Sequence, residues 1–146
     1  MPTDPRNIII AKISTGLTDM LGAVGAHATM RNTGHSSSGQ LWPDWPSGLT
    51  AGEACPLLAD SLKRIGMFQD VRLQPEGDVI RIEVRGCEFA HLGDFEATPI
   101  GERSVCFFGF GLIEKSLARL TGNAYRVSLE RRDEASDSCV EVAVRR

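Results

Sequence analysis

The chain has 146 residues, of which 42% are hydrophobic and 24% are charged, a composition typical of one globular domain. Its net charge of −3 and the lack of a basic stripe argue against a nucleic-acid-binding protein. No apolar run approaches the roughly 20 residues of a membrane span, and the start MPTDPRNIII lacks the pattern of a secretory signal. We therefore expect a single cytoplasmic domain over residues 1–146 with reduced cysteine thiols.

The first helix is predicted from its cap and its apolar period. Asp4 followed by Pro5 is a typical helix start, because a capping carboxylate precedes a proline that needs no N–H partner. Apolar residues then recur at helical spacing and predict one long apolar face: Ile9, Ile10, Ile13, Leu17, Met20, Leu21 and Val24. Such a face favours a homodimer. From Arg31 to Gly52, glycines, serines and prolines replace this period and predict a long loop or a lid.

Two further helices and two hairpins follow. Thr50 and Glu53 have capping-box spacing and begin a second helix, and residues 106–121 form a third that ends at Gly122. Strands are predicted over 69–74 and 78–85, and over 124–131 and 138–145. Ile80, Ile82 and Val84 alternate with charged residues, as in a sheet with one buried face. This order predicts an α+β fold, with an antiparallel sheet and the helices packed on one face.

The register of the last hairpin follows from matching apolar residues across its strands. This pairs Leu129 with Val140, and on the other face it sets Glu130 opposite Cys139. Directly opposed side chains approach within about 5 Å, so a carboxylate and a thiol would meet beside Asp133. Two readings stand at this point: an ordinary acidic turn with a half-buried cysteine, or half of a metal site.

The second half of the chain resembles a known family. The runs SLKRIGMFQDVRLQPEGDVIRIEVRGCEFAHLG, SVCFFGFGLIEKSLARLTGNAYRVSLE and SCVEVAV are similar to the 4-vinyl reductase domain family, most strongly over residues 57–144. That family includes hydrocarbon-binding proteins of methanogens and the sensor domains of phenol- and xylene-responsive activators. It belongs to a wider fold group that contains vesicle-transport particle subunits and nitric-oxide-sensing haem domains.

The resemblance implies a structural zinc site. In metal-binding members a cysteine opens the helix before the last hairpin, and a glutamate and two further cysteines follow. Cys106, Glu130 and Cys139 match this pattern, and Asp133 stands near the place of the missing middle cysteine. The loop is also two residues shorter than usual and lacks its glycine. The implied ligand set is Cys106, Glu130, Asp133 and Cys139.

The aromatic residues have two readings each. Trp42 and Trp45 either hold the long loop on the core or close an apolar pocket as a lid. Phe107 and Phe110 are core residues, and in ligand-binding relatives this helix lines the cavity. The glycines of FFGFG are expected to let the helix approach a neighbouring backbone or a ligand. Cys87 and His91 read as a core cysteine and a satisfied histidine, with His91 also a candidate for the ligand site.

Three functions are compatible with the sequence. The first is a small-molecule sensory domain that binds an apolar or aromatic ligand through Trp42, Trp45, Phe107, Phe110 and His91, with zinc bracing the last hairpin. The second is an accessory component in the reduction of a tetrapyrrole vinyl group. The third is a scaffold subunit like those of transport particles, without a ligand. No catalytic triad or dinucleotide motif is present, so nothing requires an enzyme.

Overall fold

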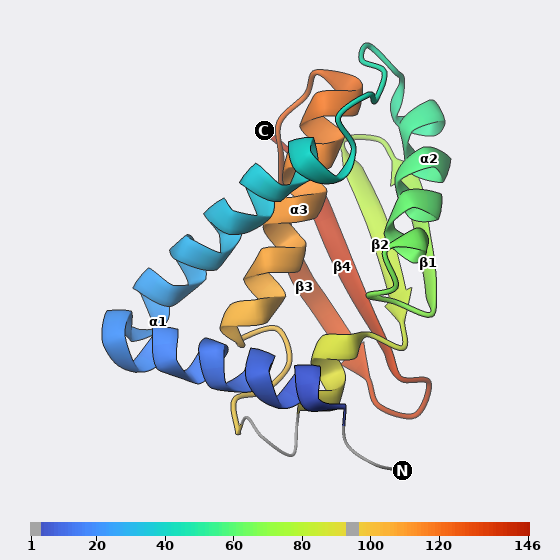
Figure 1. Cartoon of the computed structure of the whole chain (residues 1–146). Coiled ribbons are helices and arrows are strands. Elements are labelled where there is room, and N and C mark those ends of the chain that lie inside the picture. Colours follow the sequence, from blue (N-terminus) through green and yellow to red (C-terminus); the bar gives the residue numbers. More distant parts are fainter. Residues whose placement is uncertain (1–3, 93–96) are drawn as a thin grey trace.

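The protein folds into three helices on one face of a four-stranded antiparallel sheet. The computed structural model describes residues 4–92 and 97–146. Figure 1 shows α3 lying between α1 and α2, with the sheet behind them. The sheet order is β1-β2-β4-β3, which confirms the predicted α+β class and the helices on one face. The elements are α1 (Pro5–Leu41), α2 (Ala51–Arg64), β1 (Asp70–Glu76), β2 (Val79–Arg85), the 3-10 helix η1 (Glu88–Leu92), α3 (Ser104–Thr121), β3 (Tyr125–Asp133) and β4 (Ser138–Arg145).

Helix α1 is longer than the sequence predicts and is bent. It runs to Leu41, so the prediction of a loop from Arg31 is wrong, and residues 42–50 alone form the connection to α2. The glycines and serines of this part are weak helix formers, but they are small enough to pack against α3. The Ser38 and Ser116 hydroxyls, for example, are hydrogen-bonded at 2.9 Å in the interior. Tertiary packing therefore overrides the local preference.

The bend of α1 lies at Gly22, whose φ of 73° and ψ of 168° are not helical. A positive φ costs glycine little, whereas a Cβ would be strained there. The kink divides α1 into a first arm (residues 5–21) and a second arm (residues 23–41). Figure 1 shows that the two arms point in different directions and that the second arm runs along α3.

Two glycines let the second arm and α3 approach at backbone distance. A Cβ on Gly34 would lie 2.2 Å from the Phe108 carbonyl oxygen, and a Cβ on Gly111 would lie 2.1 Å from the Arg31 carbonyl oxygen. Side-chain carbon atoms do not occupy such positions, so both sites require glycine. This confirms the expectation that a glycine of FFGFG lets its helix approach a neighbouring backbone.

A buried carboxylate joins three elements next to this crossing. Glu114 of α3 forms an ion pair with Arg31 of α1, and both side chains are less than a tenth exposed. Glu114 also accepts a hydrogen bond of 2.8 Å from the Val127 backbone N–H of β3. A second hydrogen bond of 2.8 Å joins its other carboxylate oxygen to His35 Nε2. Since an uncompensated buried charge costs several kcal/mol, this set fixes the position of α1 relative to the sheet edge.

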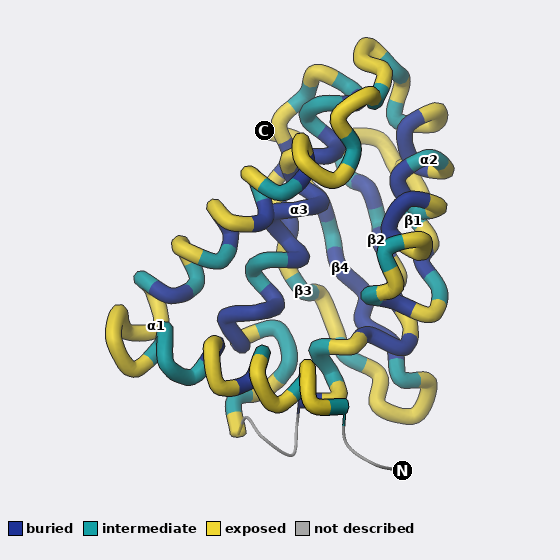
Figure 2. The backbone as a smooth tube through the Cα atoms, viewed as in Figure 1, coloured by how far each residue is buried: buried dark blue, intermediate teal, exposed yellow. Residues whose placement is uncertain are grey.

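The inner face of the sheet forms the core as predicted, but the register of the last hairpin differs. Ile80, Ile82 and Val84 are buried against α2 and α3, and Figure 2 shows the same burial along the strands. In the hairpin, a bulge at Glu130 shifts the pairing by one residue beyond Leu129. Leu129 is opposite Glu141 and Arg132 is opposite Cys139, so the predicted pairing of Glu130 with Cys139 is wrong. The predicted pairing of Leu129 with Val140 is wrong as well: the strands pair one residue away from the predicted register from Tyr125 to Leu129, and the bulge adds a second residue beyond it. Matching apolar with apolar residues failed because the true register sets the buried Glu141 opposite Leu129.

Replacing Gly34 with alanine tests the α1–α3 contact. We expect Gly34→Ala to lower the free energy of unfolding by about 2 kcal/mol, because the added methyl group forces the helices apart. Gly39→Ala is the matched control: a Cβ there meets nothing within 4 Å, so the variant should be neutral or slightly more stable. Urea denaturation measures both. Equal effects of the two substitutions would contradict the close contact.

Candidate functional site

The thiol-lined cavity is a small space between α3, η1 and the sheet. Its volume of about 20 Å³ accommodates about one water molecule. Cys87, Cys106 and Cys139 all line it, together with the carboxyl-bearing side chain of Glu141. Its apolar walls include Phe68, Val84, Phe89, Ile100, Phe110 and Leu129. Drug-sized ligands need pockets of roughly 300 Å³ or more, so this cavity is far too small for one.

Burial keeps the cavity thiols protonated. It raises the pKa of Cys87 to about 12 and that of Cys106 to about 11, and it also raises the pKa of Cys139. The Gly101 backbone N–H donates to Cys106 Sγ at 3.3 Å, which only partly offsets this effect. The thiolate is the form of cysteine that attacks electrophiles and ligates metals. The cavity therefore presents three neutral, unreactive thiols.

Glu141 is the most unusual group in the cavity. Its side chain is fully buried, and among the described residues its Oε2 atom has no hydrogen-bond partner. Burial raises the pKa of this carboxyl group from the ordinary 4.5 to about 8. Glu141 is thus a neutral acid at pH 7, because a desolvated carboxylate is more costly than a protonated carboxyl group.

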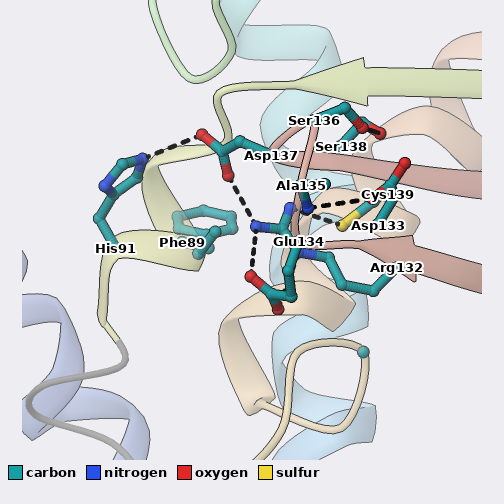
Figure 3. A network of polar contacts seen from close by, with 12 residues as sticks. Phe89, His91, Arg132, Asp133, Glu134, Ala135, Ser136, Asp137, Ser138 and Cys139 are labelled. Atoms are coloured by element: carbon teal, nitrogen blue, oxygen red, sulfur yellow. Dashed lines mark hydrogen bonds and ion pairs between the residues drawn. The ribbon is translucent and has the colours of Figure 1, made fainter.

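A cluster of polar contacts surrounds Arg132 at the hairpin, beside Cys139 (Figure 3). The Arg132 guanidinium donates to Asp137 Oδ1 at 2.7 Å and to Glu134 at 3.3 Å. It also lies 3.6 Å from Cys139 Sγ. His91 approaches Asp137 from η1, with 3.5 Å between Nε2 and Oδ2. A guanidinium ion therefore occupies the position opposite Cys139.

The predicted zinc ligands are only partly brought together. Cys106 and Cys139 line the same cavity. Glu130 forms an ion pair with Arg81 instead, and Asp133 is exposed in the hairpin loop, where its Oδ1 accepts the Ala135 N–H at 3.0 Å. Within residues 4–92 and 97–146, no three histidine, cysteine or acidic side chains lie close enough together to hold a metal ion.

The donor set does not fit zinc for a physical reason. The nearest charged neighbour of Cys139 is the Arg132 guanidinium, which opposes the entry of a cation. Zinc binding by Cys106, Glu130, Asp133 and Cys139 stays a prediction that this geometry does not favour.

The predicted ligand-binding residues lie in separate places. Phe110 lines the thiol-lined cavity, whereas Phe107 stacks on His27 with 3.8 Å between ring centroids. Trp42 stacks on Trp45 at 4.4 Å, and both pack against the core near the end of α3. His91, half exposed, faces Asp137 as described above. These five residues do not surround one pocket, and ligand binding through them stays a prediction.

The first arm of α1 presents an exposed apolar surface. Met20 is 84% exposed, and Ile9 and Ile13 are 58% and 56% exposed. Figure 2 shows the outward side of this arm as exposed, while its inner side touches a small second core of Ala11, Leu92 and Val105. Clustered exposed apolar side chains are typical of protein or membrane contact sites. We call Ile9, Ile13, Gly16 and Met20 the α1 stripe.

One described helix, α1, is long and apolar enough to cross a membrane by length and composition. This differs from the expectation of no such segment. Core helices of soluble proteins and signal sequences meet the same criterion, so the finding alone decides nothing. Its second arm packs along α3 and contains the buried Arg31, which belongs to a folded interior.

Comparison with known proteins shows the fold. No family model and no curated protein matches the chain. Among solved structures it is similar to trafficking protein particle complex subunit 3 from Naegleria fowleri, whose crystal structure has that protein covalently bound to palmitic acid. The TM-score is 0.61 with 13% sequence identity, over 97% of this chain and 95% of that one. At this identity the likeness shows a shared fold. It supports the wider fold group that the sequence indicated but not the 4-vinyl reductase family in particular.

Sequence analysis missed Glu141 because the predicted register was one residue off and set Glu141 on the outer face of the sheet. On β4, Cys139, Glu141 and Ala143 share the buried face. A glutamate in the alternating run CVEVAV was the available signal. It became a buried group only once the pairing with β2 and β3 was known.

The cysteines should react slowly with Ellman's reagent in the folded protein. All four are buried free thiols, so we expect the native chain to react about 100-fold more slowly than the chain unfolded in guanidinium chloride. The unfolded chain should release four equivalents of thionitrobenzoate. A thiol that reacts rapidly in the native state would contradict the closed cavity.

Glu141 should make stability fall as pH rises. The folded state holds the Glu141 proton up to about pH 8, whereas the unfolded state loses it near pH 4.5, so unfolding releases a proton between these values. The free energy of unfolding should therefore decrease from about pH 4.5 to about pH 8. Glu141→Gln should reduce this slope, and the exposed Glu83→Gln should leave it unchanged. Urea titrations at several pH values measure it, and equal slopes in all three proteins would refute the assignment.

Proposed function

We propose that the protein is a non-enzymatic assembly subunit that binds a protein partner through the α1 stripe. The observation that carries this proposal is the exposure of Ile9, Ile13 and Met20 on a helix arm that extends from the core. Water contact with such side chains is unfavourable, by about 25 cal/mol per Å² of apolar surface. A partner that covers the stripe recovers this free energy.

The rest of the molecule is consistent with a scaffold. The thiol-lined cavity holds about one water molecule, and its thiols are protonated. The similar Naegleria protein is, by its printed name, a subunit of a multi-protein particle. We extend this role to the present chain as a proposal, together with the expected cytoplasmic location.

The sensory and vinyl-reduction readings stay predictions. The first requires the cavity to expand far beyond its about 20 Å³ before it can accept an aromatic or hydrocarbon ligand. The palmitic acid of the Naegleria protein is a larger molecule still. Membership of the 4-vinyl reductase domain family rests on the sequence motifs alone. Native mass spectrometry that finds a retained small molecule would favour these readings over a scaffold.

Site-specific photo-cross-linking tests the proposed function. A benzophenone amino acid at Met20 should give a discrete protein adduct in cells, because this position lies on the α1 stripe. The control places the same group at Val144, an exposed apolar residue on β4, and should give none. Mass spectrometry would identify the adduct, and mixing the purified proteins should reconstitute the complex. Absence of any adduct at Met20 would contradict the proposal.

A further inference from the structure

We infer that the partner on the α1 stripe is a second copy of this chain, with the two first arms packed antiparallel about a twofold axis at Gly16. This inference rests on the proposed function and names its partner. It follows from three features of the first arm: an apolar line, a glycine at its centre and two opposite charges placed symmetrically about that glycine.

The apolar line matches the geometry of helix pairing. Ile9, Ile13, Gly16 and Met20 are spaced by four, three and four residues, so they lie on one line along the helix. This is the spacing by which two helices interlock side chains along a shared seam. In an antiparallel pair centred near Gly16, Ile13 of each copy lies beside Met20 of the other.

Gly16 is suited to the crossing point. A Cβ at this position would meet nothing within 4 Å, so the space outside it is open. Helix axes lie about 8–10 Å apart, and they come closest where the contact residue is small. A twofold axis that passes beside Gly16 would bring two glycines face to face, as an isologous contact requires.

The charges specify the direction of pairing. Lys12 and Asp19 are both exposed and lie on the same flank of the stripe, about 10.5 Å apart along the helix axis, with Gly16 near the midpoint. In an antiparallel pair, Lys12 of each copy faces Asp19 of the other, which gives two equivalent ion pairs. In a parallel twofold pair the two copies of this flank lie on opposite sides of the interface, so neither ion pair would form.

The charge pattern distinguishes a second copy from a membrane. Helices that lie on membrane surfaces carry mainly lysine and arginine beside their apolar face. The flank of the α1 stripe instead has one charge of each sign, which is neutral toward an anionic surface and complementary to itself. The contact is one helix pair, so the dimer belongs to the small, reversible class of interfaces.

Charge exchange tests this arrangement. The full-length chain should reach twice its 15.9 kDa monomer mass in sedimentation equilibrium as its concentration rises through the micromolar range. Lys12→Asp and Asp19→Lys should each weaken the dimer about tenfold, because each places like charges together at two sites. The double variant Lys12→Asp, Asp19→Lys should restore it. Lys115→Asp, an equal charge change at an exposed position of α3, is the control and should have no effect.

Cysteine cross-linking tests the axis independently of affinity. Gly16→Cys should form an intermolecular disulfide under mild copper–phenanthroline oxidation, because the two positions meet at the axis. Ile9→Cys should not, since an antiparallel pair moves its two copies about 20 Å apart along the axis. The native thiols are buried and should not compete. Circular dichroism confirms that each variant is folded.

Three outcomes would overturn the inference. A monomer at all concentrations, a dimer that the charge variants do not change, or cross-linking of Ile9→Cys in place of Gly16→Cys would each do so. Binding to anionic phosphatidylserine vesicles by a monomeric chain would reassign the stripe to a membrane. If the chain is monomeric but Met20 still cross-links to a different protein, the inference fails while the proposed function stands. If neither occurs, both fail.

Discussion

The contact between α1 and α3 at Gly34 and Gly111 is the constraint on which the rest of the structure depends. Two backbones meet there at distances that exclude a Cβ, so neither helix can rotate or slide without a clash. The buried Glu114 carboxylate lies next to this crossing and joins α1, α3 and the start of β3. Steric fit and charge pairing thus favour the same arrangement. A different packing of the helices, or loss of one charged partner, would strongly destabilise the fold.

This fixed crossing also explains why the first arm of α1 is exposed. The second arm is held along α3, and the non-helical backbone of Gly22 turns the first arm away. That arm contacts the rest of the protein through a small apolar cluster near η1 and through a 2.9 Å hydrogen bond between the Thr18 and Ser104 hydroxyls. Its opposite side is then left uncovered, and the apolar pattern that would otherwise indicate a core helix becomes a surface. A straight helix of the same sequence would not present the α1 stripe in this way.

The interior of the sheet shows how one extra residue changes a site. The bulge at Glu130 places Arg132, rather than Arg131, opposite Cys139. Glu130, at the bulge, forms an ion pair with Arg81, and Glu141 Oε2 has no hydrogen-bond partner among the described residues. The result is a small pocket with neutral thiols and a guanidinium beside Cys139. The sequence had instead indicated a carboxylate and a thiol that could ligate a metal. The chemistry of the hairpin therefore depends on its backbone pairing more than on its composition.

The sequence by itself determined the α+β class, the order of the elements, the capping of α2 at Thr50 and the buried face of β2, because these follow from local periodicity and caps. The sequence also predicted the apolar face of the first helix. Only the tertiary structure decided that α1 continues past Arg31, since weak helix formers become favourable when their small size permits packing on α3. It alone decided the register at Glu130 and which acids are buried, because a bulge and a long-range ion pair arise from contacts between segments far apart in the chain.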